Sequence, residues 1–142
     1  MSHPCDLMAR LRVLDANANR AGEGLRVVEE YARFALDDRY LTELLKSIRH
    51  DLTHLLRLIP LDARYSARDT IGDVGTTVTT ESEARRESAR DIAEASIKRS
   101  EQALRAIEEY SKGEFPQAAA AAEQLRYRLY TVARALRTTA TS

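Results

Sequence analysis

Aromatic residues and cysteine are scarce in this chain. Its 142 residues include no tryptophan, two phenylalanines and a single cysteine, Cys5. Without large aromatic side chains, a hydrophobic core has to be built from leucine, isoleucine, valine and alanine. A lone cysteine excludes a disulfide within the chain and fits a reducing compartment, so we expect a cytoplasmic protein. Five glycines and three prolines, with 44% hydrophobic and 31% charged residues, favour an all-α fold.

The chain also lacks an excess of either charge, and it lacks long apolar runs. Its 22 basic residues balance 22 acidic residues, whereas a general nucleic-acid binder usually has a basic excess. No stretch approaches the roughly 20 apolar residues of a membrane span, and the N-terminal residues have no signal-peptide core. We therefore expect no nucleic-acid partner, no membrane partner and a single domain, residues 1–142.

Arginine dominates the basic residues, with 19 arginines against three lysines. Arginine binds phosphate or carboxylate through two hydrogen bonds at once, whereas lysine acts as a point charge. The bias therefore favours an anionic ligand, although a GC-rich genome produces the same bias.

A polar helical run occurs twice in the sequence. Residues 16–31 and residues 95–110 share seven identities at an offset of 79. The identical pairs are Ala16/Ala95, Arg20/Arg99, Leu25/Leu104, Arg26/Arg105, Glu29/Glu108, Glu30/Glu109 and Tyr31/Tyr110. Any amphipathic helix repeats its apolar positions, but only one of these seven is a large aliphatic residue. The duplicated charges indicate that both copies present similar groups to a ligand or a partner.

Apolar residues recur at alternating spacings of three and four, which predicts four helices. We place these helices at about residues 5–36, 39–59, 81–112 and 116–138. The start at residue 81 rests on Thr80 and Glu83, which fit a capping box. The segment 60–80 lacks helical periodicity and is predicted to be a functional loop, because long loops are uncommon in small domains.

The second pair of predicted helices matches the first, and Arg49 corresponds to Arg126 at an offset of 77. Two similar αα-hairpins can pack against each other around one apolar core. The expected fold is therefore all-α: an up-down four-helix bundle built from two pseudo-repeated αα-hairpins with a long central loop.

Several polar residues of the first predicted helix lie at or beyond the edges of its apolar face. At about 100° per residue, Asn17 and Glu29 lie at the edges of that face. Three charged residues that can pair along one surface point away from it, and they have counterparts in the second copy: Arg20, Glu23 and Arg26, matched by Arg99, Gln102 and Arg105. A solvated face of ion pairs explains this pattern. A site at the interface of a homo-oligomer, or one covered by the long loop, also explains it.

Two glycines, Gly22 and Gly24, interrupt the same predicted helix. Each costs roughly 0.8–1 kcal/mol relative to alanine in a helix interior. They indicate a close approach, either by a second helix or by a ligand.

The predicted loop carries groups suited to anions and cations. Gly72 and Gly75 allow backbone amides to turn towards an anion, and Asp69 and Asp73 can hold Mg²⁺ or accept a proton. The segment GDVGTT lacks the lysine of a Walker A loop. The sequence has no zinc signature, because His3 is isolated and His50 and His54, although they share a helix face, have no acidic or cysteine partner set. A capped surface loop without a ligand remains the alternative for this segment.

Four stretches of the chain together resemble a known family, the monofunctional hydroxymethylpyrimidine phosphate kinase domain found alone or at the N-terminus of some bacterial thiamine phosphate synthases. The stretches are residues 10–38, 45–52, 68–77 and 98–112. The first contains DANANRAGEGLR, which is the most specific part of the resemblance. A thiamine phosphate synthase barrel does not fit in 142 residues, so the resemblance implies a stand-alone enzyme or a domain that works fused to, or associated with, that synthase.

The resemblance implies transfer of the γ-phosphoryl group of ATP to hydroxymethylpyrimidine phosphate, with Mg²⁺ accompanying ATP. For this reaction, the expected catalytic residues are Asp69, Asp73 and Arg68. The expected substrate- and nucleotide-binding residues are Asn17, Asn19, Arg20, Glu23, Arg26, Arg49, Gly75, Thr76, Arg99 and Arg105. The expected metal ligands are Asp69, Asp73 and Glu29. Because the helical run is duplicated, Arg26 and Arg105 are expected to serve different substrates.

Two other readings of the residues remain open at this point. Apolar faces on four helices and a charged outer surface also fit a non-enzymatic helical interaction or regulatory module. An arginine-rich helical domain also fits a small all-α lyase or mutase that clamps a carboxylate substrate without metal or nucleotide.

Overall fold

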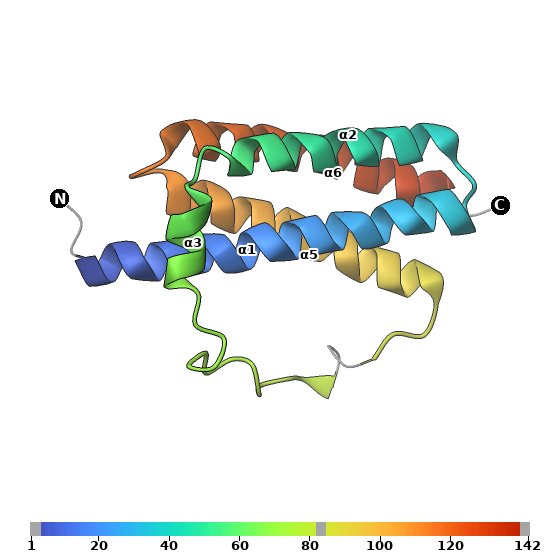
Figure 1. The fold of residues 1–142 in the computed structure, drawn as a ribbon. Coiled ribbons are helices and arrows are strands. Elements are labelled where there is room, and N and C mark those ends of the chain that lie inside the picture. The colour runs from blue at the N-terminus through green and yellow to red at the C-terminus, as the bar shows by residue number, and fades with distance from the viewer. Residues whose placement is uncertain (1–3, 82–84, 140–142) are drawn as a thin grey trace.

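The computed structural model describes residues 4–81 and 85–139, and all regular structure in these residues is helical (Figure 1). The helices are α1 (Pro4–Glu30), continued by a π-helical turn η1 (Tyr31–Ala35), α2 (Arg39–Leu56), α3 (Leu61–Ala67), α5 (Ala89–Ser111) and α6 (Pro116–Thr139). The all-α prediction is confirmed for this part of the chain. None of its helices is long and apolar enough to cross a membrane.

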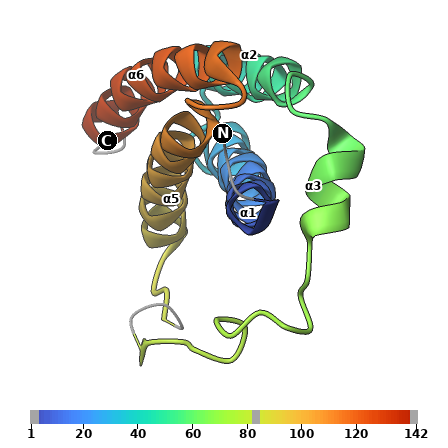
Figure 2. The same cartoon turned by 90° about the vertical axis from the view of Figure 1, so that its left-hand side faces the viewer.

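The four long helices form a ring in which α1 contacts α5, α5 contacts α6, α6 contacts α2, and α2 contacts α1. Figure 1 shows α1 and α6 running in one direction and α2 and α5 in the other, so each neighbouring pair is antiparallel. The predicted up-down order required helix direction to alternate along the sequence. In the structure it does not alternate, because α2 and α5 run in the same direction. Instead, the connection between α2 and α5 returns along the bundle in Figure 1, and the end-on view of Figure 2 shows it passing below α1 and α5.

The closest helix contact joins α1 to α5, and two small residues permit it. A Cβ atom on Gly24 would overlap Ser100 Oγ and would lie 2.8 Å from the carbonyl oxygen of Ser96. Ser100 Oγ donates a hydrogen bond to the carbonyl oxygen of Ala21 at 3.2 Å. Ala21 and Ser100 are 79 residues apart, which is the offset of the repeat, so the two hairpins meet at equivalent positions. The structure therefore resolves the Gly24 prediction in favour of a second helix.

Two buried ion pairs explain part of the duplicated charge. Glu29 pairs with Arg49 at 3.0 Å within the first hairpin, and Glu108 pairs with Arg126 at 3.0 Å within the second. The glutamates are 6% and 4% exposed. These four residues were aligned by the repeat, and each pair fixes one hairpin internally. Their duplication reflects packing of the two hairpins.

Several predicted boundaries need correction. Residues 60–80 are not all loop, because α3 occupies Leu61–Ala67. The third long helix begins at Ala89 and not at 81, since Ser88 caps it by accepting a hydrogen bond from the Asp91 amide at 3.0 Å. Residues 85–87 are not helical, and Glu83 of the predicted capping box lies outside the described residues.

Candidate functional site

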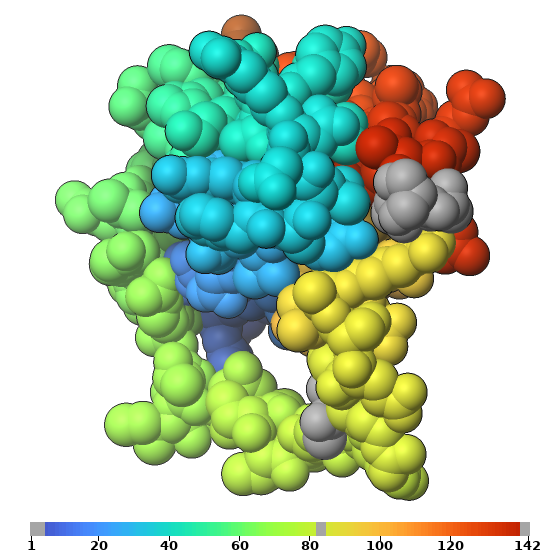
Figure 3. Space-filling model, turned by 90° about the vertical axis from the view of Figure 1, so that its right-hand side faces the viewer, coloured from blue at the N-terminus to red at the C-terminus, as the bar shows by residue number. Residues whose placement is uncertain are grey.

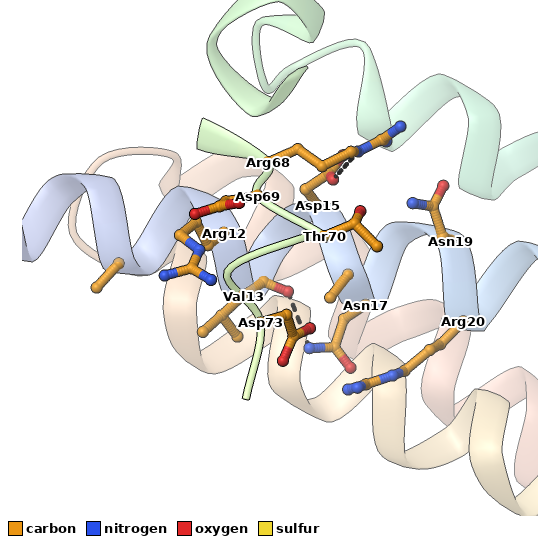
Figure 4. Close-up of a pocket in the computed structure, with 12 residues that line it drawn as sticks. Arg12, Val13, Asp15, Asn17, Asn19, Arg20, Arg68, Asp69, Thr70 and Asp73 are labelled. Carbon is orange, nitrogen blue, oxygen red and sulfur yellow. Dashed lines mark hydrogen bonds and ion pairs between the residues drawn. The ribbon is translucent and has the colours of Figure 1, made fainter. Parts of the chain in front are cut away.

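A pocket of about 530 Å³ opens between the N-terminal half of α1 and the loop that follows α3. Its lining contains three arginines, three aspartates and two asparagines together with small residues: Ala9, Arg12, Val13, Asp15, Ala16, Asn17, Asn19, Arg20, Arg68, Asp69, Thr70 and Asp73. Figure 3 shows the hollow that separates the loop from the helices above it. Figure 4 shows that one wall of this pocket comes from α1 and the other from the loop.

An arginine–aspartate clasp joins these two walls. Arg68, directly after α3, donates Nε and Nη2 hydrogen bonds to the Asp15 carboxylate on α1 at 2.6 and 2.8 Å. Arg64 of α3 lies 3.5 Å from the same carboxylate. Asp15 is only 3% exposed. The Arg68 guanidinium also stacks over the Tyr65 ring at 4.2 Å. The clasp fixes the start of the loop against α1.

The electrostatics of the clasp keep Arg68 charged. Its hydrogen bonds to Asp15 raise the pKa of the Arg68 guanidinium above its ordinary value, and this exceeds the opposing effect of desolvation. The Nε and Nη2 groups of Arg68 are therefore occupied by their hydrogen bonds to Asp15. The Arg68 side chain is 37% exposed, and it lines the pocket.

The α1 wall presents amides and two further arginines to the pocket. Asn17 is buried and donates its Nδ2 to the carbonyl oxygen of Val13 at 2.9 Å, which leaves its side-chain oxygen as an acceptor. Asn19, Arg12 and Arg20 are exposed. These side chains share one side of α1 because they are spaced by about one or two helical turns.

The loop wall presents two aspartates that shape their own turns. Asp69 Oδ1 accepts the Gly72 amide at 2.8 Å, and Asp73 Oδ1 accepts the Gly75 amide at 2.7 Å. Thr76 Oγ1 donates to the Asp73 carbonyl oxygen at 3.1 Å. Each turn uses one carboxylate oxygen, and the other can face a ligand. Both aspartates are exposed at the pocket.

These aspartates suit a cation that arrives with a phosphate ligand. Mg²⁺ is usually held by one or two carboxylates together with substrate phosphates and water. In residues 4–81 and 85–139, no group of three or more histidine, cysteine or acidic side chains forms a complete metal cage. Two exposed loop carboxylates at the pocket therefore fit a shared magnesium–phosphate site.

The structure brings together six of the residues predicted for the site and separates six others from it. The pocket contains Asn17, Asn19, Arg20, Arg68, Asp69 and Asp73. Gly75 and Thr76 follow in the same loop. The residues that do not line the pocket are Glu23, Arg26, Glu29, Arg49, Arg99 and Arg105.

The separated residues have other surroundings. Glu29, predicted as a metal ligand, is buried against Arg49 in the first hairpin, so the three predicted metal ligands do not converge. Arg105 forms a surface pair with Glu109 at 3.2 Å. Glu23, Arg26 and Arg99 are exposed on the bundle surface.

Sequence reasoning missed Arg12, Asp15 and Thr70. Arg12 lies one helical turn before Ala16 and two turns before Asn19, on the same side of α1. Its spacing from Asn19 could therefore have predicted Arg12 as a pocket residue. Asp15 lies beside the apolar face of α1, but its importance depends on α3, which the sequence did not reveal. Thr70 stands between the two predicted loop residues, Asp69 and Asp73.

Comparison with known proteins shows the family to which the chain belongs. The ThiD2 family model matches residues 12–135. The chain is 50% identical over 126 residues to the thiamine-phosphate synthase of Rhodopirellula baltica, which covers 89% of this chain and 34% of the relative. It is 47% identical over 121 residues to the thiamine-phosphate synthase of Synechocystis sp., covering 85% and 34%.

A third relative, the thiamine-phosphate synthase of Nostoc punctiforme, is 43% identical over 123 residues, covering 85% of this chain and 33% of the relative. The chain thus spans about a third of the length of these curated relatives. No solved structure matches it. Since the family model covers nearly the whole chain, the chain belongs to the ThiD2 family.

Proposed function

We propose, from membership of the ThiD2 family, that this chain is a cytoplasmic kinase of thiamine biosynthesis. It transfers the γ-phosphoryl group of ATP to hydroxymethylpyrimidine phosphate and forms the pyrimidine pyrophosphate. The observation that carries the proposal is one pocket in which Arg12, Arg20 and Arg68 face Asp69 and Asp73. The thiamine-phosphate synthase names of the relatives support the pathway.

The pocket has the charges that phosphoryl transfer requires. This reaction depends mainly on positioning and on neutralising negative charge, with little covalent chemistry for the protein. Arginine suits that task because its planar guanidinium binds phosphate oxygens in pairs. Arg12 and Arg20 are the exposed cations of the α1 wall, and they bind the phosphates of the two substrates. The attacking group is a phosphate oxygen that is already ionised, so a strong general base is unnecessary.

Asp69 and Asp73 hold Mg²⁺ together with the ATP phosphates. When bound, the metal neutralises charge on the β- and γ-phosphates. The turns closed by the Gly72 and Gly75 amides keep the two carboxylates at the pocket. Thr70 and Thr76 lie beside them and supply hydroxyl groups for phosphate oxygens.

The asparagines of α1 recognise the pyrimidine. The side-chain oxygen of Asn17 accepts from the ring amino group, because its amide nitrogen already donates to Val13. Asn19 is exposed at the same pocket and can present either a donor or an acceptor to the ring.

We further propose that the chain works fused to, or associated with, a thiamine-phosphate synthase. The relatives are about three times as long as the region that they share with this chain. A kinase that makes the pyrimidine pyrophosphate delivers the substrate that a thiamine-phosphate synthase consumes.

The proposal is tested by incubating the purified chain with ATP, Mg²⁺ and hydroxymethylpyrimidine phosphate, and by following ADP and the pyrimidine pyrophosphate by chromatography. Asp69→Asn or Asp73→Asn should lower kcat by roughly 100-fold, the scale of removing one group that stabilises transition-state charge. Asp62→Asn is the matched control, because Asp62 lies exposed in the first turn of α3 and outside the pocket.

The arginines provide a second arm of this test. Arg12→Ala and Arg20→Ala should raise KM for at least one phosphorylated substrate, whereas Arg39→Ala should not, since Arg39 is a surface residue paired with Glu43. Absence of both products, together with no ATP binding in calorimetry, would reject the kinase and favour a helical interaction module. Turnover of a carboxylate substrate without Mg²⁺ would favour the lyase or mutase.

A further inference from the structure

A second pocket, of about 300 Å³, lies at the other end of the bundle from the site described above. It opens between α5 and α6 beside the end of α1, and none of its residues lines the first pocket. Its lining combines apolar side chains with three cations and two glutamates: Tyr31, Arg90, Ala93, Glu94, Ile97, Lys98, Glu101, Ala133, Leu136 and Arg137.

The most unusual member of this pocket is Glu101, a glutamate that is only 6% exposed. Among the described residues, Glu101 forms an ion pair with Lys98 at 3.5 Å, and the Lys98 side chain is 69% exposed. Burial raises the pKa of the Glu101 carboxyl above its ordinary value, which outweighs the lowering by Lys98. A buried carboxyl with so weak a partner costs stability unless something else binds it.

The internal repeat does not explain Glu101. The buried glutamates that hold the hairpins together, Glu29 and Glu108, correspond to each other at the repeat offset. Glu101 corresponds at the same offset to Gly22, which carries no side chain. The duplicated pairing within the two hairpins therefore does not account for this carboxyl.

The repeat also shows that this groove is left uncovered. In the first hairpin, α3 packs against the matching face of α1, where its Arg64 and Ala67 are buried, and Arg64 and the following Arg68 pair with Asp15. The counterpart of Asp15 is Glu94, which lines the second pocket. In the described residues, no helix takes the place of α3 over α5 and α6.

The walls of the second pocket suit a flat ring. Ile97 and Leu136 supply an apolar surface, and Tyr31 supplies an aromatic one. Tyr31 begins the π-helical turn η1, where its carbonyl oxygen accepts the Leu36 amide at 3.1 Å. Such turns inside or after an α-helix often mark functional positions.

The remaining side chains of the pocket suit a phosphate group. Arg90 and Arg137 both pair with Glu94, at 3.1 and 2.7 Å, and Lys98 is exposed beside them. Three cations and two carboxylates leave one positive charge in excess. An anionic group on the ligand is therefore favoured over a second cation.

We propose that this pocket binds a small amino-substituted heteroaromatic monophosphate. The Glu101 carboxyl binds the amino edge of the ring. The ring lies between Tyr31 and the aliphatic side chains of Ile97 and Leu136. The phosphate binds Arg90, Lys98 and Arg137. Carboxyl groups suit such edges because they offer an acceptor to the amine and, when protonated, a donor to the ring nitrogen.

Two sources share this chemistry, a purine nucleoside monophosphate and a phosphorylated aminopyrimidine. The test therefore uses AMP and hydroxymethylpyrimidine phosphate as separate probes, in calorimetric titrations without Mg²⁺ or a co-substrate. The pocket is separate from the proposed kinase site and does not require that activity. Binding is measured without turnover, so a failed kinase assay and a failed binding test are distinct results.

The decisive variant is Glu101→Met, which keeps the side-chain volume but removes the hydrogen-bonding groups. Glu123→Met is the matched control, because Glu123 is half-buried on α6 and does not line the pocket. Arg12→Ala is the control for binding at the first pocket. A thermal midpoint of Glu101→Met at or above that of the unmodified chain establishes that the variant is folded, as expected when a buried carboxyl is removed.

At least one probe should show a binding event whose Kd is raised 10-fold or more by Glu101→Met and is unchanged by Glu123→Met, whereas Arg12→Ala should weaken only binding at the first pocket. Which of the two probes behaves in this way identifies the source of the ligand. The proposal is overturned if neither probe binds. It is also overturned if Glu101→Met leaves the binding of both probes unchanged, whatever the effect of Arg12→Ala.

Discussion

At the scale of the residue, Asp15 is the group on which the first pocket depends most. It is nearly fully buried, it binds Arg68 through two hydrogen bonds, and Arg64 lies against it. Asp15→Asn keeps the shape but leaves two guanidinium groups without their counter-charge. We expect the free energy of unfolding to fall by about 3 kcal/mol, the lower end of the range for breaking a buried pair, because Arg68 is partly exposed.

This prediction is measured by denaturant unfolding together with limited trypsin digestion. Because the clasp anchors the loop, Asp15→Asn should also accelerate cleavage between α3 and α5. Asp6→Asn is the control, since it breaks the exposed pair with Arg10 and should cost less than about 1 kcal/mol. Equal losses in the two variants, with unchanged loop cleavage, would contradict an anchoring role for Asp15.

The sequence identified the loop aspartates more successfully than the partners of the helix charges. Asp69 and Asp73 were predicted at the site because they lie with two glycines in a non-helical stretch, and the structure places both at the first pocket. Glu29 was misassigned as a metal ligand because its neighbour Arg49 lies 20 residues away. That contact becomes visible only when the two helices of the hairpin are packed in register.

At the scale of the element, the packing of α1 against α5 depends on a single missing side chain. Gly24→Ala should destabilise the protein by about 1–3 kcal/mol, the usual cost of overpacking, although alanine is the better helix former. The reason is the position that a Cβ would take against the backbone of Ser96 and the side chain of Ser100. Thermal and denaturant unfolding would measure the change.

Gly22→Ala is the matched control in the same helix. A Cβ at Gly22 would have Leu52 Cδ2 as its nearest neighbour at 4.0 Å, which is ordinary contact. The variant should therefore gain roughly 0.5–1 kcal/mol from helix propensity. If both glycine variants changed stability in the same direction, the close approach of α1 and α5 would not be the cause.

The helical segments that sequence reasoning misplaced, α3 and the first turn of α5, have little apolar surface. α3 was missed because its buried face is formed by Arg64 and Ala67, while Leu61 and Tyr65 are exposed. Its stability comes from the ion pair with Asp15, and hydrophobic periodicity does not detect such a contact. The start of α5 was misplaced because Thr80 and Ser88 both resemble caps, and no apolar side chain before Ile92 distinguishes them.

At the scale of the whole molecule, the helical ring and the loop have separate roles. Every residue from 70 to 80 is exposed, including the aliphatic side chains of Ile71, Val74 and Val78. Replacing residues 70–80 with glycine and serine at equal length should therefore change the thermal midpoint by no more than about 3 °C. The same change should abolish kinase activity, because it removes Asp73 and Thr70.

Calorimetry and the coupled assay of both products would check this separation. A fall in the midpoint well beyond that of surface substitutions would mean that the loop contributes to the packed structure. Retained kinase activity would mean that the phosphates bind elsewhere.

The repeat made the number of long helices and their hairpin pairing predictable, but not the order of their directions. An offset of 79 says that two units are similar and does not say how they are oriented towards each other. The antiparallel contact of α1 with α5 decides this. It forces the connection from α2 to α5 to travel the length of the bundle, and that connection carries the candidate site.

The pairing of α1 with α5 has a further consequence for a chain that is still being synthesised. α1 packs more extensively against α5 than against α2, its own hairpin partner. Ala21 therefore leaves the ribosome 79 residues ahead of Ser100, the residue it contacts. At bacterial or eukaryotic elongation rates, this corresponds to a delay of about 4–16 s. Throughout that interval, one apolar flank of the nascent first hairpin stays open to chaperones.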